Sequence, residues 1–360
     1  MAPAILLMVS WAALEEAGLT DTIFTSDRVL TVQKEFFEPE DNKQQEQIIK
    51  TSMTDTAFAF SDSIASYEST IINDPYTDNQ WALEQIGVPT LWQITCGDPE
   101  IIIAVLDTGI DCYHEDLNGK IVTELNFTDS PTVNDLHGHG THIAGIIVAS
   151  LNNNIGIAGF APECKLMNVK VADDTGKCRA TDISEGIIWA TDNGASIINI
   201  SLELAESLAE LEAAIDYAWN KGVLIIAAAG NNGSNLPVYP AFYENSIAVS
   251  ALRQNDTLAP LSNYGDWVDL AAPGFNIYST LPGNNYGYKS GTSFAAAYTS
   301  GMAALLFDIV IDTNDNGRLN DEVREALESG CYETGVSGTG FGRIDAGKSL
   351  QFVSYSYGIN

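Results

Sequence analysis

The sequence is poor in basic residues. Lys and Arg together number 16, against 48 Asp and Glu in 360 residues, which gives a formal net charge of −32 at pH 7. A surface this acidic repels phosphate backbones, so the composition excludes nucleic-acid binding. The same carboxylates favour solubility, and some of them can gather into calcium sites because hard cations prefer oxygen ligands.

Long apolar runs and paired cysteine motifs are also missing. No apolar run reaches the roughly 18 residues of a bilayer-spanning helix, so we expect no membrane span. The five cysteines include no CxxC pair, and their odd number leaves at least one thiol unpaired in a monomer, the oligomeric state we expect. A hydrophobic content of 45% nevertheless provides for a globular core, and the length suits one large domain plus a smaller appendage.

The N-terminal region lacks basic residues before Arg28. A secretory signal has a basic start, an apolar core and a small-residue cleavage site. Residues 1–14 supply the apolar core, and Ser10-Trp11-Ala12 supplies the cleavage site. We therefore interpret residues 1–14 as a truncated signal peptide and expect a secreted, extracellular protein. The polar residues 15–72 are interpreted as a propeptide or N-terminal extension, and residues 73–360 as the main domain.

The main domain alternates apolar runs with helical stretches. Continuous β-branched runs, typical of strands buried on both faces, occur at residues 100–106, 165–171, 196–200, 223–228 and 246–250. Helical patterns lie between them at residues 182–192 and 207–220. Strands alternating with helices predict an α/β fold with three layers, in which helices flank a doubly wound, mainly parallel sheet.

Reactive residues follow these runs. Asp107 and Asn231 each come directly after a predicted strand, and Ser293 lies in a Gly-Thr-Ser turn that opens a helix. In doubly wound sheets, ligands bind beyond the carboxyl ends of the strands. The three residues are therefore expected to meet at one edge.

A serine hydroxyl is a weak nucleophile until an imidazole takes its proton, and the imidazole needs a buried carboxylate to orient it. The chain offers Asp107 in VLDTGID, His139 in HGHGTHIAG and Ser293 in GTSFAAA. Each piece alone is weak, because an Asp after a strand often caps a loop and a Gly-Thr-Ser often starts a helix. A fourth segment, IIAAAGN, ends in Asn231.

Together the four motifs resemble the subtilisin family, and most closely its thermitase-like members. The resemblance runs from about Asn73 to the C-terminus and keeps the family's order of Asp, His and Ser. It implies a secreted serine endopeptidase that hydrolyses proteins through an acyl-enzyme. Asp107 would orient His139, His139 would act as base and then acid for Ser293, and Asn231 would hold the oxyanion.

The substrate-binding residues implied by the resemblance are Ser201, Leu202, Glu203 and Gly176. The family's Ser-Leu-Gly-Gly segment, which pairs with the substrate, reads Ser-Leu-Glu-Leu here. Glu203 at the rim of the pocket predicts a preference for a basic residue before the cleaved bond. The family's Pro-His after the serine is replaced by Ala297-Tyr298, a change that could shift the start of the helix.

Two other function classes are weighed against the peptidase. A metallohydrolase could use the four histidines between His114 and His142, but His139 and His142 lack the glutamate of an HExxH motif. His114, His137 and His142 are interpreted as structural. A non-catalytic peptide-binding relative would have lost catalytic residues, and all four are present.

Calcium is the cofactor that the resemblance implies. The segment Leu151–Ile157 looks like the family's calcium loop, in which alternate residues supply carbonyls and one Asn supplies its side chain. Asp74, near the start of the domain, and Asp116, in the His-Glu-Asp-Leu stretch, match the family's carboxylate ligands. The implied ligands of a structural Ca²⁺ are Asp74, Asp116, Leu151, Asn153, Ile155 and Ile157.

A second acidic loop begins like an EF-hand. Asp312, Asn314 and Asn316 occupy positions 1, 3 and 5, and Gly317 occupies position 6. Position 12 is Val323, and the nearest acid is Glu322, one residue early. The pattern leaves open whether this loop binds calcium or is a solvated turn.

The resemblance also bears on the cysteines. In a subtilisin-like sheet the strands at residues 101–106 and 165–171 are parallel neighbours, and Cys96 and Cys164 precede them at the same end. Adjacent strands lie about 4.8 Å apart, within reach of a disulfide. We predict a Cys96–Cys164 disulfide at the end opposite the active site, the alternative being two neighbouring thiols. Residues 15–72 could also act as an intramolecular inhibitor.

Overall fold

The computed structural model describes residues 22–25, 28–31 and 72–356. The chain divides into two units, residues 1–70 with 353–360, and residues 71–352. In the first unit, β1 (Thr22–Thr25) pairs antiparallel with β2 (Arg28–Thr31), a hairpin that the sequence did not predict. The predicted signal peptide, and the rest of the predicted propeptide apart from Ile72, lie outside the described residues.

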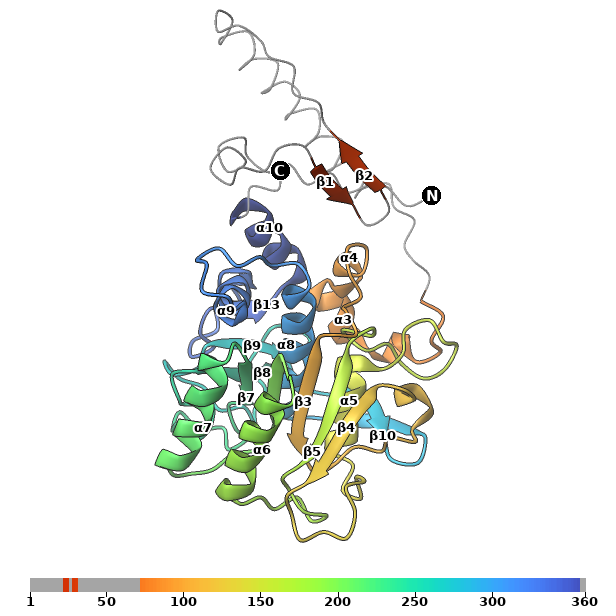
Figure 1. The fold of residues 1–360 in the computed structure, drawn as a ribbon. Helices are drawn as coiled ribbons and strands as arrows, with labels where there is room; N and C mark the ends of the chain where they lie inside the picture. Colours follow the sequence, from red (N-terminus) through yellow and green to blue (C-terminus); the bar gives the residue numbers. More distant parts are fainter. Residues whose placement is uncertain (1–21, 26–27, 32–71, 357–360) are drawn as a thin grey trace, which may run out of the picture. The chain divides into compact units, whose positions relative to one another are not determined.

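The second unit is built on a nine-stranded sheet (Figure 1). Its order is β12-β13-β9-β8-β7-β6-β3-β5-β4, and among these pairs only β12 with β13 is antiparallel. The central strands are β3 (Ile102–Asp107), β5 (Lys165–Lys170), β6 (Ile197–Ile200), β7 (Leu224–Ala228) and β8 (Ser246–Leu252). The flanking strands are β4 (Ile121–Asn126), β9 (Leu270–Pro273), β12 (Cys331–Tyr332) and β13 (Arg343–Ile344).

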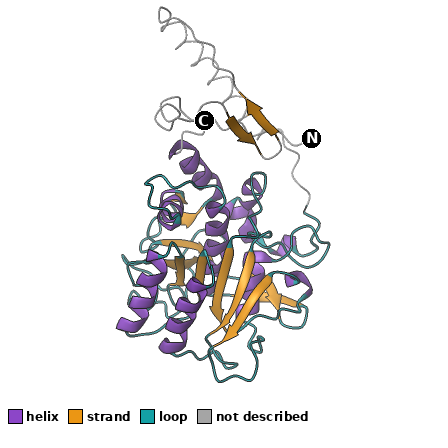
Figure 2. Ribbon diagram, viewed as in Figure 1, coloured by secondary structure: helices purple, strands orange, loops and turns teal. Residues whose placement is uncertain are grey.

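Helices cover the sheet because alternate strand residues point to opposite faces. Ala104 and Leu106 pack in one core cluster with apolar residues of α6 (Ala180–Asp192) and α7 (Ala209–Asn220). Figure 2 shows these helices against the sheet, and α6 and α7 contact each other. Asn199 in β6 instead donates to Ser300 in α8 (Thr292–Phe307), which contacts α5 (Gly140–Val148). The three-layer, mainly parallel fold is therefore confirmed.

The remaining elements connect and extend this framework. Three short helices precede the sheet, a fourth follows β3, a hairpin lies beside α5, and two helices follow α8. These elements are η1 (Thr77–Asn79), α3 (Trp81–Ile86), α4 (Val88–Leu91), η2 (Glu115–Leu117), β10 (Ile277–Leu281), β11 (Asn285–Lys289), α9 (Asn320–Ser329) and α10 (Ala346–Ser356). Within the described ranges, no helix is long and apolar enough to cross a membrane.

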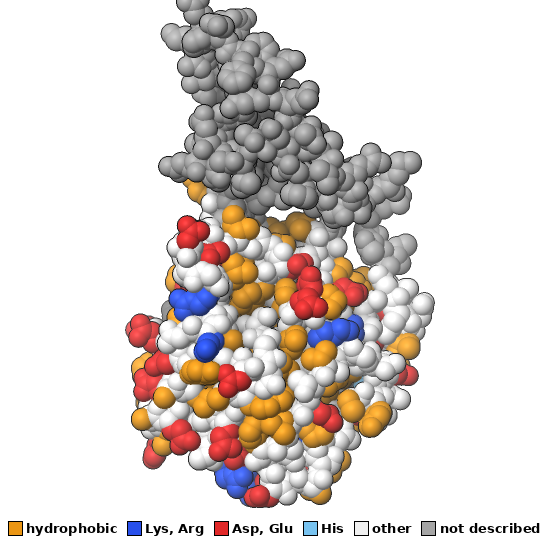
Figure 3. Space-filling view, viewed as in Figure 1, with side chains coloured by type: hydrophobic (Ala, Val, Ile, Leu, Met, Phe, Trp, Pro, Cys, Tyr) orange, Lys and Arg blue, Asp and Glu red, His pale blue; other side chains and the backbone are white. Residues whose placement is uncertain are grey.

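The acidic composition is visible on the surface. Figure 3 shows acidic side chains scattered over one face among polar and apolar groups, with basic side chains fewer. α8 is different, since every residue from Thr292 to Leu306 is buried. A helix that is apolar on all sides belongs in the interior, and the N-terminus of this one carries Ser293. The replacement of Pro-His by Ala297-Tyr298 leaves the helix start at Thr292, before the serine.

The predicted disulfide between Cys96 and Cys164 is wrong, because both are free thiols. Their segments are neighbours, since Glu163 N donates to the carbonyl of Cys96 at 3.0 Å. The sulfurs, however, point to different partners. Cys96 Sγ donates to the carbonyl of Trp92 at 3.8 Å, whereas Cys164 Sγ lies against the backbone of Gly97. Burial raises the pKa of Cys164 to about 12, which keeps this thiol unreactive.

Candidate active site

Asp107 and His139 form the centre of the site. Asp107 is the last residue of β3 and is fully buried. His139 Nδ1 lies 2.8 Å from Asp107 Oδ1 and 2.9 Å from Oδ2. The N–H of Thr108 donates to Oδ1 at 2.7 Å. The imidazole is thereby held in the tautomer that leaves Nε2 free to accept a proton.

The turn before α5 fixes the position of His139. Asp135 is buried and accepts hydrogen bonds from the side chain of Thr108, the N–H groups of His137 and Gly138, and both the N–H and the hydroxyl of Thr141. These five bonds satisfy the carboxylate and define the backbone on either side of His139. Gly140 is required next to it, because a Cβ there would lie 2.1 Å from the carbonyl of Gly109.

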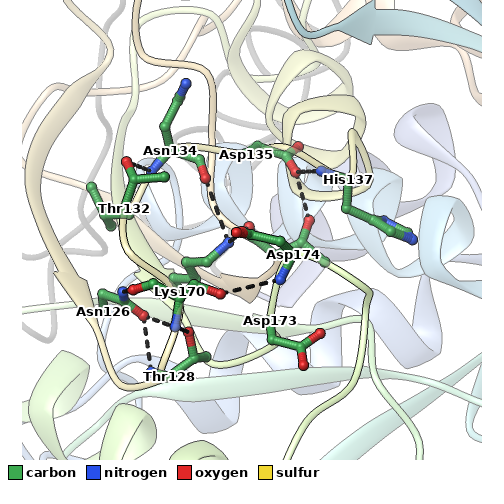
Figure 4. A network of polar contacts seen from close by, with 12 residues as sticks. Asn126, Thr128, Thr132, Asn134, Asp135, His137, Lys170, Asp173 and Asp174 are labelled. Carbon is green, nitrogen blue, oxygen red and sulfur yellow. Dashed lines mark hydrogen bonds and ion pairs between the residues drawn. The ribbon is translucent and has the colours of Figure 1, made fainter.

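A buried lysine ties this turn to the neighbouring strand (Figure 4). Lys170, the last residue of β5, forms a 2.9 Å ion pair with Asp174 and also donates to the carbonyls of Thr108 and Asn134. A buried cation needs such partners, since its desolvation is otherwise costly. The loops after β3 and β5 are thus joined by one charge.

Ser293 lies in the first turn of α8. Its side chain is 5% exposed, and Oγ donates to the carbonyl of Ser201 at 3.4 Å. The rings of His139 and Phe294, the next residue, have centroids 5.7 Å apart. Within the described part of the chain, Oγ makes no hydrogen bond to His139. Such bonds are often long in a free enzyme and shorten when substrate binds.

Asn231 lies beyond the end of β7 and faces the start of α8. Its Oδ1 accepts from the N–H of Thr292 at 2.8 Å and from the Thr292 hydroxyl at 3.3 Å. Because the carbonyl end of this amide is anchored, the NH₂ end is left to donate to a ligand. The N–H of Ser293 belongs to the first turn of a helix, where backbone donors have no partner within the helix. The arrangement offers two donors to an oxyanion.

Opposing charges act on the pKa of His139. Burial acts to lower it, but the adjacent Asp107 charge and hydrogen bond outweigh burial, so the pKa is raised above the ordinary imidazole value. Lys289 opposes this rise through its positive charge. Lys289 Nζ donates to the carbonyl of Gly138 at 2.8 Å, which places it beside the same turn.

The predicted substrate-binding residues lie near this centre. Ser201 follows β6, and its Oγ donates to Asn199 Oδ1 and to the carbonyl of Ser293. The Glu203 carboxylate accepts from Asn231 N at 3.2 Å and from Asn232 Nδ2 at 3.0 Å.

Gly176 lies in the loop between β5 and α6, where the ring of His137 is its neighbour. Leu202 instead packs partly into the core.

The other histidines do not converge on a metal. His114 Nε2 bonds to the carbonyl of Asn285 at 3.1 Å, and His142 Nε2 bonds to the carbonyl of Gly287 at 3.2 Å. Burial lowers the pKa of His142 to about 3, so it is neutral and structural. His137 is exposed beside Gly176 and is not held in the interior, as His114 and His142 are.

The structure brings the side chains of the predicted calcium ligands together. Asp74 accepts from the N–H groups of Asn152 and Asn153, while Asp116 accepts from Asn153 Nδ2 at 2.9 Å and from the N–H of Ile157. Burial raises the pKa of both carboxyls, and the charge of Asp74 adds to the rise at Asp116. Two buried carboxylates beside an amide and a loop of carbonyls fit the oxygen-rich chemistry of Ca²⁺.

Sequence reasoning missed four residues that shape the site. Asp135 and Thr292 orient the groups around them, Lys170 joins the turn before α5 to β5, and Lys289 adds a charge. Thr292 is part of the GTS motif, so its position was a usable signal. Asp135 and Lys289 are ordinary loop and strand residues in the sequence, and only the fold brings them to His139.

Comparisons with known proteins point to one family of serine proteases. Residues 98–328 match the Subtilase family. The chain is 44% identical to a thermophilic serine proteinase from Bacillus sp. (strain AK1), over 78% of this chain and 69% of that protein. It is 42% identical to thermitase from Thermoactinomyces vulgaris, over 78% of this chain and 99% of thermitase. A solved protease from Pseudoalteromonas arctica PAMC 21717 is similar with a TM-score of 0.72 and 29% identity, over 79% of this chain and all of that one.

The charges around His139 predict the pH dependence of turnover. His139 accepts a proton only when neutral, and its pKa is raised, so activity falls with acidification at a pH above the ordinary imidazole pKa. Replacing Lys289 by Met removes an opposing positive charge, so the pKa of His139 rises further. The acidic limb of the pH profile, in which activity falls as His139 is protonated, therefore moves to higher pH. Lys221→Met, which removes an exposed charge at the end of α7, serves as the control and leaves the limb in place. Profiles of kcat/KM against pH measure this, and an unmoved limb in Lys289→Met contradicts it.

Proposed function

The chain belongs to the Subtilase family and is a subtilisin-like serine endopeptidase, and on this premise we propose that Asp107, His139 and Ser293 are its catalytic triad, with Asn231 in the oxyanion hole. The observation that carries the proposal is the contact of His139 Nδ1 with both oxygens of the buried Asp107. It leaves the imidazole with one nitrogen free, and the ring lies near Phe294, the residue that follows Ser293.

The reaction follows from these positions. Ser293 Oγ forms a bond to the carbonyl carbon of the substrate as its proton passes to His139 Nε2. The negative charge that develops on the substrate oxygen is met by Asn231 Nδ2–H and the Ser293 N–H. The peptide C–N bond then breaks, the amine leaves with the proton from His139, and an acyl-enzyme remains. Water repeats the sequence and restores the serine.

We propose that polypeptide substrates bind in extended form between the segment Ser201–Glu203 and the loop at Gly176. An extended peptide can add to an exposed strand edge through main-chain hydrogen bonds. The Glu203 carboxylate lies against the backbone of Gly230, where a Cβ would be 2.4 Å from its Oε2. It thus sits beside Asn231, where the residue before the cleaved bond would be held. We propose that this charge selects Lys or Arg.

Calcium binding at the loop Leu151–Ile157 is part of the proposal. Asp74 and Asp116 would hold the ion with Asn153 and the carbonyls of Leu151, Ile155 and Ile157. Bound Ca²⁺ would neutralise two buried carboxylates and fix the loop that Asp74 joins to the start of the domain. An ion that binds only the folded protein stabilises it by mass action.

We further propose that the protein is secreted as a zymogen and acts as a monomer. Residues 1–14 would direct export, and residues 15–72 would be removed, having served as an inhibitor. The division of the chain into a unit ending at Thr70 and a unit starting at Ile71 supports a boundary near this point.

Modification with a fluorophosphonate tests the nucleophile. The reagent is expected to label Ser293 as a single site, found by mass spectrometry, and to leave Ser293→Ala unlabelled. Asn231→Ala should lower kcat by about 10²–10³, because it removes one oxyanion donor. Asn235→Ala, an exposed residue in the same loop, should leave kcat unchanged. Unlabelled Ser293 in folded protein, or full turnover without Asn231, would refute the assignment.

The charge of Glu203 predicts a specificity change. Glu203→Gln keeps an oxygen that can accept from Asn231 N but removes the negative charge. We expect it to lose about fivefold in preference for Lys and Arg over uncharged residues, equivalent to about 1 kcal/mol for an exposed pair. Glu206→Gln is the matched control on the same exposed segment. Cleavage profiles on a peptide library measure this, and identical profiles for wild type and Glu203→Gln dispose of the idea.

The position of the mature N-terminus follows from the proposed boundary. N-terminal sequencing of active, secreted protein should find a start close to Asn73. Active enzyme that still carries residues 1–72 would contradict removal of this segment.

A further inference from the structure

The loop between α8 and α9 has a second arrangement of oxygen atoms, remote in sequence from the loop at Leu151–Ile157. Asp312 Oδ1 accepts from the N–H groups of Asn314 and Asn316, and its Oδ2 accepts from the N–H of Gly317 at 2.7 Å. Gly317 has a φ of +77°, so the turn at position 6 of the EF-hand pattern is formed. The sequence lacked only an acidic residue at position 12.

Glu322 takes the place of that residue from one position earlier. It is 4% exposed, and its Oε1 accepts from Thr313 N, from the Thr313 hydroxyl and from Asn314 Nδ2. The carboxylate is therefore turned into the loop. Its position in the first turn of α9 allows this, because the helix begins at Asn320 and directs the side chain back toward the preceding residues.

Two carboxylate oxygens at this place have no partner. Glu322 Oε2 and Asp321 Oδ1 are both buried and accept no hydrogen bond within the described residues. Buried acceptors are normally satisfied, so such atoms require an explanation. Asn314 Nδ2 donates to both Asp321 Oδ2 and Glu322 Oε1, which places the two acidic groups side by side.

No basic side chain neutralises this group. In the described ranges, Asp312, Asp321 and Glu322 take part in no ion pair. Arg318 lies in the same loop but donates to the carbonyls of Trp219 and Asn220 instead. Neighbouring buried carboxylates without a counterion are unstable unless a proton or a cation joins them.

We propose that this loop is a calcium site, with Asp312, Asn314, Asn316, Asp321 and Glu322 supplying its ligands. The carboxylates alone do not form a metal-binding cluster, since no group of three or more acidic, His or Cys side chains does so in the described chain. The amides are therefore essential. Mixed carboxylate and amide oxygens on a flexible loop suit Ca²⁺, whereas Mg²⁺ demands a rigid octahedron and keeps its waters.

The amides already face the acidic groups. Asn314 Nδ2 and Asn316 Nδ2 donate to Asp321 Oδ2 at 2.8 and 2.7 Å. An amide presents nitrogen to carboxylates and, after a half-turn about its terminal bond, presents oxygen to a cation. The two amide oxygens now accept from the N–H groups of Asn316 and Arg318, so binding would exchange these two backbone hydrogen bonds for contacts with the ion.

The site would brace the C-terminal part of the domain. The loop joins α8, which carries Ser293, to α9, and α8 and α9 contact each other. Asn320 at the start of α9 donates to the carbonyl of Trp219 at the end of α7. An ion here would fix the connection among three helices at a place distinct from the substrate-binding segments.

Calcium titration of the full chain tests the site. The Ser293→Ala variant is used as background because it cannot digest itself and because the result is then independent of catalysis. After the metal is stripped with a chelator, calorimetry with Ca²⁺ alone counts the sites. We expect Glu322→Gln to bind one equivalent fewer than the background, or to bind that equivalent at least tenfold more weakly. Glu325→Gln, an exposed acid on the same helix, should bind as the background does.

Asp116→Asn separates this site from the loop at Leu151–Ile157. Asp116→Asn should lose the equivalent of Ca²⁺ bound at the loop Leu151–Ile157 and keep the one that Glu322→Gln loses. The double variant of Asp116→Asn with Glu322→Gln should lose both equivalents. If Glu322→Gln does not fold, as judged by circular dichroism, Asp312→Asn replaces it and should show the same loss. Binding by Glu322→Gln or Asp312→Asn that equals Glu325→Gln in stoichiometry and affinity overturns the proposal. A background protein whose calcium is all abolished by Asp116→Asn alone overturns it as well.

Discussion

The buried contact between Asp107 and His139 is the interaction on which the rest of the site depends. A carboxylate with no exposed surface is costly unless it is paired and hydrogen-bonded, and His139 and Thr108 provide both. The pair in turn needs β3 to end at a fixed point and the turn before α5 to return to it. Asp135 and Lys170 hold that turn through buried hydrogen bonds and one ion pair. The proposed catalytic site thus rests on a polar network that the sheet makes rigid.

The same kind of buried support holds the groups that would donate to the oxyanion. α8 is buried along its length, so its first turn is held in place by packing. Asn231 is anchored to that turn through Thr292, and Ser201 is anchored to the carbonyl of Ser293. The ends of β6 and β7 and the start of α8 are therefore joined by hydrogen bonds. A pre-organised arrangement of this kind stabilises developing charge without reorganisation during the reaction.

The sequence was informative where one physical signal dominated. The buried strands read as continuous apolar runs, and five of them lie within a residue or two of their predicted bounds. The proposed triad residues were selected because they follow such strands or open a helix and match family motifs. Asp135 and Lys289 were missed because their roles arise only from tertiary contact. The Cys96–Cys164 disulfide failed because strand spacing says nothing of which way two sulfurs point. The role of the Asp312 loop stayed open because a fixed EF-hand spacing does not show how a helix start can redirect the side chain of Glu322.

The central claim is that Ser293 attacks the substrate while Asn231 and the Ser293 N–H receive the oxyanion. A crystal structure of the protein with a peptide aldehyde tests this most directly, because the aldehyde forms a tetrahedral adduct with the nucleophile. The account predicts a covalent bond from Ser293 Oγ, with the adduct oxygen about 2.7–3.1 Å from Asn231 Nδ2 and from the Ser293 nitrogen. It also predicts His139 Nε2 within hydrogen-bond distance of Oγ. An adduct on another residue, or an oxygen turned away from Asn231, would contradict it.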